Sequence, residues 1–78
     1  MENHQTHLLS LEELAAQKEI AWIEEIKSMG QEELRTTNPK KYPVGKAMIL
    51  EAYKKSDRSR ISYYEQRLAQ LKKGAHAF

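Results

Sequence analysis

Residues 10–30 read SLEELAAQKEIAWIEEIKSMG, a segment with the end signals and the apolar period of an α-helix. It opens with Ser10-Leu11-Glu12-Glu13, a capping box, in which the serine oxygen accepts from the glutamate amide and the glutamate side chain accepts from the serine amide. Gly30 is a predicted C-cap, because glycine enters the left-handed region without a Cβ clash. Between them, apolar residues recur with the helical period, at Leu11, Leu14, Ala15, Ala21, Trp22, Ile26 and Met29. The stretch predicts a helix over residues 11–29.

Two large apolar residues, Ile20 and Ile23, fall outside this predicted stripe. One interpretation is ordinary, because single exposed isoleucines are common on protein surfaces. The other is a second contact surface on the far side of the helix, so Ile20 and Ile23 are candidate partner-binding residues.

The segment after this helix favours a loop with one short turn. Residues 31–35 predict one further helical turn, and residues 38–45 hold both prolines and Gly45. Pro43 suits the first turn of a following helix, where its missing N–H costs nothing. The residues from Ala47 to Tyr53 are strongly apolar and predict a helix over 44–55.

Residues 54–60 are wholly polar and include two good N-cap types, Ser56 and Asp57. We therefore expect the helix to be interrupted here, so that two separate helices form. The alternative is one continuous helix whose middle is exposed to solvent. The last helix is predicted over 59–73, because four apolar residues follow the 3-4-3 spacing of a coiled-coil seam and Gly74 suits a C-cap. The seam residues are Ile61, Tyr64, Leu68 and Leu71.

These signals predict an all-α protein, a small three-helix bundle with an extra short turn. Residues 1–9 are expected to be a flexible lead-in, residues 10–74 a single helical domain and residues 75–78 a short tail. A chain of 78 residues has a thin core and no cysteine to reinforce it. Self-association as a homodimer, or binding to a partner, is therefore expected to complete the structure. The predicted core is Trp22, Ile26, Met48, Leu50, Ile61, Tyr64 and Leu68.

Charge is divided along the chain. Residues 1–38 hold three basic and eight acidic residues, a net charge of −5, whereas residues 39–78 hold ten basic and three acidic residues, a net charge of +7. One interpretation is a basic interaction surface in the C-terminal half. The other is an acidic helix that folds against a basic one and needs no partner.

The sequence contains no recognisable catalytic motif, and we expect no enzymatic activity, no cofactor and no metal site. The three glycines are isolated, so a phosphate-binding loop is missing, and no serine has a histidine in a plausible frame. His4 and His7 have a spacing that suits a metal on a helix, but no third ligand is clearly placed. The longest apolar run, 47–50, is far too short to span a bilayer, and the N-terminus resembles no signal peptide. A cytoplasmic location is expected.

The candidate binding residues lie in the basic half. Tyr63 with Arg60 and Arg67, at helical spacings of three and four, predicts a compact anchor patch next to Arg58, because tyrosine and arginine are favoured interface anchors. The alternative is a tyrosine that lies over arginine stems on an inert surface. A DNA- or RNA-binding regulator is the second hypothesis, since four basic residues surround the predicted turn at Lys54, Lys55, Arg58 and Arg60.

Two blocks also suggest a family. Ile49-Leu50-Glu51-Ala52, followed after a gap by Ser62-Tyr63-Tyr64-Glu65-Gln66-Arg67-Leu68, resembles the second half of the theta subunit of bacterial DNA polymerase III. That resemblance implies a helical accessory subunit that binds a proofreading exonuclease. From the small helical architecture and the lack of catalytic motifs, the expected function is a small non-catalytic regulator, inhibitor or accessory subunit that acts on a larger protein, of bacterial or phage type. An accessory subunit of a DNA polymerase proofreading complex is the further alternative that the resemblance implies.

Overall fold

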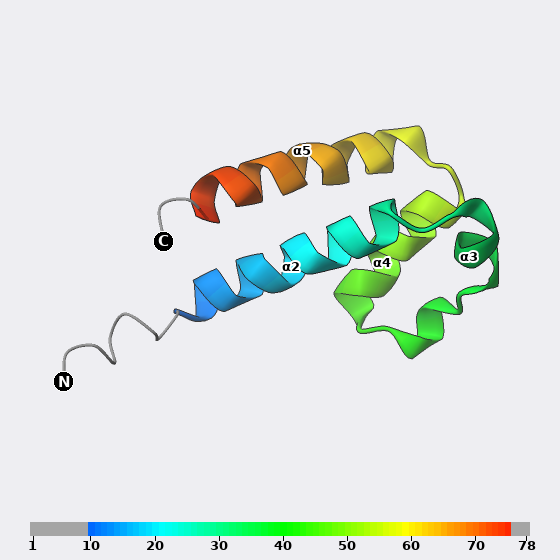
Figure 1. Cartoon of the computed structure of the whole chain (residues 1–78), viewed down its shortest axis with the longest axis horizontal. Helices are drawn as coiled ribbons and strands as arrows, with labels where there is room; N and C mark the ends of the chain where they lie inside the picture. The colour runs from blue at the N-terminus through cyan, green and yellow to red at the C-terminus, as the bar shows by residue number, and fades with distance from the viewer. Residues whose placement is uncertain (1–9, 76–78) are drawn as a thin grey trace.

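The computed structural model describes residues 10–75, and over this range the chain is all-helical, as predicted. Two long helices run antiparallel, and a third crosses them (Figure 1). In chain order the elements are α2 (Leu11–Lys27), α3 (Gln31–Thr36), the 3-10 turn η1 (Pro39–Lys41), α4 (Val44–Lys54) and α5 (Arg58–Ala75). The three-helix bundle with an extra short turn is confirmed. The three histidines lie outside the described residues.

Helix α2 begins where the capping box predicts. The Ser10 hydroxyl accepts from the Glu13 amide at 3.0 Å, and the Glu13 carboxylate accepts from the Ser10 amide at 2.8 Å. The helix ends at Lys27, two residues before the predicted end, with Ser28 as its C-cap. Gly30 is not the predicted left-handed C-cap, because its φ is −74° and it instead precedes α3 as the N-cap.

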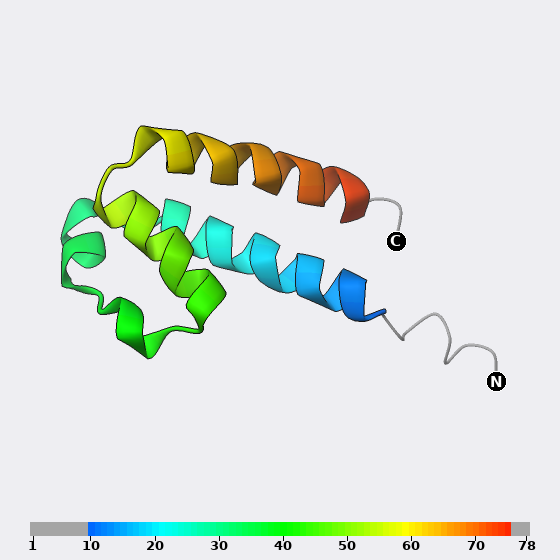
Figure 2. The ribbon, with the colours of Figure 1, turned by 180° about the vertical axis from the view of Figure 1, so that it is seen from behind.

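The buried side of α2 differs from the predicted stripe. Ile23 and Ile26 are fully buried and Ile20 packs against them, whereas Leu11 is 85% exposed and Leu14 is 47% exposed. Figure 2 shows the reason: α4 lies across the C-terminal half of α2, and the first turns of α2 extend past it beside α5 alone. The hypothesis that Ile20 and Ile23 form a free contact surface was wrong, because Ile23 is fully buried in the core and Ile20 is partly buried against it.

A short turn separates α4 from α5, as predicted. Ser56 has φ +54°, the only positive φ among the described non-glycine residues. Around it the Ser56 amide donates to the Tyr53 carbonyl at 3.2 Å and the Asp57 amide donates to the Ala52 carbonyl at 3.0 Å, which is a Schellman motif. Asp57 then caps α5 through a 3.3 Å bond from the Arg60 amide. Helix α5 continues to Ala75, so Gly74 lies inside it and not at the predicted cap.

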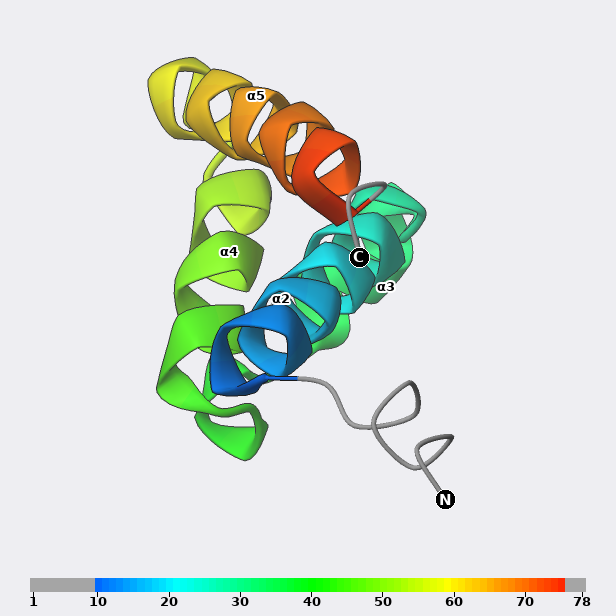
Figure 3. The same cartoon turned by 90° about the vertical axis from the view of Figure 1, so that its left-hand side faces the viewer.

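The core lies where the three helices meet, as seen down the long axis in Figure 3. Of the predicted core residues, Ile26, Leu50 and Leu68 are buried, and Trp22 and Tyr64 pack against them while partly exposed. Ile61 is only half-buried and lies outside this cluster. Met48 is 50% exposed and was wrongly assigned, because α4 turns a different side inward. The buried residues are Ile23, Ile26, Ile49, Leu50, Ala52 and Leu68.

Candidate protein-binding surface

The four predicted anchor residues of α5 do not form one patch. Tyr63 is 57% exposed and its ring meets Tyr64 edge-on, with centroids 5.2 Å apart. Arg67, one turn further along, lies on the same side of the helix. Arg60 is exposed and forms an ion pair with Asp57 at 3.6 Å. Arg58 lies about 140° around the helix from Tyr63, so it does not belong with them.

Arg67 is already engaged within the chain. Its Nε and Nη2 atoms lie 2.5 and 3.0 Å from the two carboxylate oxygens of Glu19 on α2. This bidentate hydrogen bonding, together with the charge of Glu19, raises the pKa of the Arg67 guanidinium. Arg67 therefore links α5 to α2, and its charge is paired within the chain.

Two more ion pairs join the acidic and basic halves. Lys72 of α5 pairs with Glu24, and Lys46 of α4 pairs with Glu25 at 2.9 Å. The Lys46 ammonium also lies 4.2 Å from the centroid of the Tyr42 ring, and its side chain is only 13% exposed. Three of the ten basic residues of the C-terminal half thus pair with glutamates of the N-terminal half, so part of the division of charge along the sequence is used for pairing between helices.

A groove, here called the inner groove, opens where α2, α4 and α5 meet. Its volume is about 430 Å³, and Tyr63 and Arg67 lie on its α5 side. Gly45 lets α4 approach α2 closely, because a Cβ at this position would lie 2.9 Å from the Trp22 ring. The lining includes Glu19, Trp22, Met48, Ile49, Tyr63 and Arg67.

A second groove, the outer groove, lies on the other side of Met48, between α4 and η1. It measures about 460 Å³, and Val44, which is 79% exposed, stands at its edge. Its lining includes Pro39, Lys40, Tyr42, Val44, Met48 and Glu51. Met48 therefore forms a ridge between two grooves, and Val44 continues this ridge by one turn. We call Val44 and Met48 the α4 ridge.

The α4 ridge was not predicted from the sequence, because Met48 was assigned to the core. A usable signal exists: positions 44, 48, 51 and 55 have 4-3-4 spacing, so they share one side of a helix. The buried residues Ile49 and Leu50 occupy the other sides. Two apolar stripes on one short helix indicate that one of them stays outside the core.

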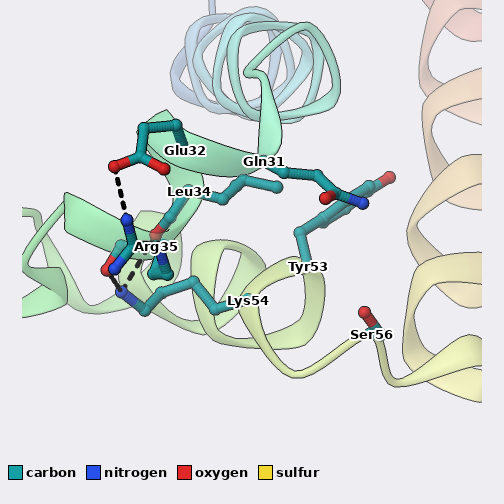
Figure 4. A pocket seen from close by; sticks show the side chains of 7 residues that line it. All are labelled: Gln31, Glu32, Leu34, Arg35, Tyr53, Lys54 and Ser56. Atoms are coloured by element: carbon teal, nitrogen blue, oxygen red, sulfur yellow. Dashed lines mark hydrogen bonds and ion pairs between the residues drawn. The ribbon is translucent and has the colours of Figure 1, made fainter.

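A third pocket, between α3 and α4, is structural in character (Figure 4). The Lys54 ammonium donates to the carbonyls of Leu34, Arg35 and Thr37 at 2.8–3.1 Å, which uses its three protons and stabilises the negative end of α3. Arg35 pairs with Glu32 at the rim. The pocket's polar groups are therefore mostly satisfied by one another.

Within residues 10–75, no group of three histidine, cysteine, aspartate or glutamate side chains is placed to hold a metal ion. Over the same range, no helix has the length and apolar character needed to cross a membrane. No protein-family model, curated protein or solved structure matches the chain. The resemblance to the theta subunit therefore stays a prediction.

Proposed function

We propose that this chain is a small non-catalytic regulator, inhibitor or accessory subunit that binds a larger protein through the α4 ridge and the inner groove. One observation carries the proposal: three of the five large apolar side chains that the described fold leaves exposed gather here, at Val44, Met48 and Tyr63. The other two, Leu11 and Leu14, stand at the start of α2. A cluster of exposed apolar residues beside grooves is typical of a protein interface.

The composition of the surface supports a protein partner over nucleic acid. Tyrosine, tryptophan and methionine are enriched in interface cores. Nucleic-acid binding needs a row of free lysine and arginine side chains, since phosphate contacts supply most of its affinity. Here Lys46, Arg67 and Lys72 pair with glutamates, and Lys54 is bound to carbonyls. The other basic residues of residues 39–75 that form no ion pair within the described range are Lys40 and Lys41 on η1 and Arg58 and Lys73 near opposite ends of α5, so they do not make one continuous row.

The accessory-subunit form of this proposal, with a proofreading exonuclease as the partner, rests on the resemblance to theta. Four residues of the resembling blocks line the inner groove, namely Ile49, Tyr63, Tyr64 and Arg67. A purified exonuclease of that class is therefore a direct candidate to test beside an open search for partners.

The test is affinity capture from cells of the source organism, with and without nuclease, using Met48→Glu, Tyr63→Ala and the unchanged chain. Both substitutions alter exposed side chains, so circular dichroism should show the native helix content. Each is expected to lose a protein that the unchanged chain retains, because truncating an interface anchor costs about 2 kcal/mol or more. Tyr63→Ala is a cleaner choice than a double change with Arg67, whose ion pair supports the fold.

Leu11→Glu is the matched control, since it also places a charge at an exposed apolar position but lies outside both grooves. It should retain the same protein. The proposal fails if Met48→Glu binds as the unchanged chain does, or if nuclease removes every captured protein.

A further inference from the structure

The exposed side of α4 has the geometry of a helix-packing surface. Val44, Met48, Glu51 and Lys55 follow the 4-3-4 spacing with which one helix meets another. The first two are apolar and exposed, whereas Glu51 and Lys55 pair with each other at 3.7 Å. The apolar half of this side is thus the part that lacks a packing partner within the described chain.

The two grooves beside Met48 fit side chains that a helix would supply. Each encloses about 430–460 Å³ and they share Met48 as a common wall. Side chains at positions i and i+3 or i+4 of a second helix stand about 5–6 Å apart. Two such side chains would enter one groove each, with Met48 between them, as ridges pack into grooves in helix pairs.

The charge beside the α4 ridge indicates which kind of helix would bind there. Lys40 and Lys41 of η1 are exposed, and neither forms an ion pair with any residue in the described range. They lie just before the N-terminus of α4, where the first turn holds no acidic residue and no side chain caps the helix. This edge is therefore positive, and an acidic segment complements it.

A second copy of the chain fits less well. A two-fold interface places the same surface against itself. If two α4 helices paired antiparallel about Met48, the Lys40–Lys41 edge of one copy would lie towards Lys55 of the other. Like charges would then face each other, whereas an acidic partner would meet opposite charge.

We infer that the occupant of the α4 ridge is an acidic amphipathic helix of another protein, with apolar residues on each side of Met48 and carboxylates beside Lys40 and Lys41. This inference rests on the proposed function and specifies its partner. Trp22, the single tryptophan of the chain, is half-buried in the inner groove and reports on its occupancy.

The probe is a designed peptide of about 18 residues, or five helical turns, with leucine at helical spacing, glutamate on its other sides, and no aromatic residue. It should change the Trp22 emission of the full chain saturably, with a Kd below about 100 µM. Changing Lys40 and Lys41 together to glutamate should weaken binding about tenfold, and Met48→Glu should abolish it. Leu11→Glu should leave it unchanged.

Three controls decide the outcome. A peptide with lysine in place of glutamate and a scrambled acidic peptide should not bind; equal binding by either would overturn the inference. Sedimentation that shows a dimer of the unchanged chain and a monomer of Met48→Glu would overturn it in favour of a second copy. If the acidic peptide fails to bind while cellular capture still depends on Met48, the proposed function stands and the acidic helix is wrong.

Discussion

Tyr53 carries a buried polar atom that the fold leaves without a partner. Its side chain lies in the pocket between α3 and α4 that Figure 4 shows, and its hydroxyl is the only buried side-chain polar atom of the described residues that makes no hydrogen bond. Burial, followed by the charge of Glu65, raises the pKa of the Tyr53 phenol above its ordinary value of 10.0. A buried group that makes no hydrogen bond destabilises a fold by about 1–3 kcal/mol.

Tyr53→Phe is therefore expected to raise the free energy of unfolding by about 1 kcal/mol at neutral pH, because the ring keeps its packing and the unpaired hydroxyl is removed. The pH dependence has a definite sign. Since the folded pKa lies above the unfolded one, the stability that this proton contributes is present below pH 10 and is lost as the pH rises through the folded pKa. Urea unfolding from neutral to alkaline pH should show a smaller alkaline loss in Tyr53→Phe than in the unchanged chain.

Tyr63→Phe is the control for this measurement, because it removes an exposed hydroxyl and should change stability little. Part of the alkaline loss should persist in Tyr53→Phe, since burial also raises the pKa of Tyr64. A destabilised Tyr53→Phe would mean that the hydroxyl has a partner after all.

The junction between α4 and α5 carries backbone strain at one residue. Ser56 adopts φ +54° at the Schellman position, where glycine is usual because it has no Cβ penalty. The turn at this junction determines the direction in which α5 runs back along α2. The strained residue therefore lies at the turn that orients α5.

Ser56→Gly should raise the free energy of unfolding by about 0.5–1 kcal/mol, because relief of the left-handed strain exceeds the added entropy of the unfolded chain. Thermal and urea unfolding measure this directly. Ser62→Gly, inside α5, is the matched change and should lower stability by about 0.5–1 kcal/mol, since glycine is a poor helix former. Equal losses in both variants would show that Ser56 is not strained.

Pairing of charge between α2 and α5 orients the two long helices of the molecule. The Glu19–Arg67 pair joins residues 48 positions apart and is partly shielded, with 24% and 40% of the two side chains exposed. The Asp57–Arg60 pair is local and more exposed. The first pair is therefore expected to contribute to tertiary packing and the second only to the start of α5.

A double-mutant cycle with Glu19→Gln and Arg67→Gln should give a coupling energy of about 1 kcal/mol, discounted for solvent screening. The same cycle at Asp57 and Arg60 should give about 0.3 kcal/mol. High salt should reduce both values. A coupling near zero at Glu19 and Arg67 would mean that apolar contacts alone orient α5 on α2.

Local signals in the sequence were sufficient to predict the helices and their approximate ends. The capping box at Ser10, the polar break around Ser56 and the spacing of Tyr64, Leu68 and Leu71 all depend on bonds and contacts within a few residues. The position of Tyr63 off this seam followed from the same spacing. These features are confirmed to within one or two residues at most helix ends.

Which side of each helix faces inward depended on the packing of distant segments. Apolar residues surround much of α2, so its periodicity alone did not separate the buried Ile23 from the exposed Leu11. The position of α4 determines which residues of α2 are buried, because burial depends on the surfaces that pack against a helix and not on that helix alone. For the same reason the sequence did not show that Met48 lies between two grooves. It also did not show the ion pair of Arg67 with Glu19, because the two residues are far apart in the sequence.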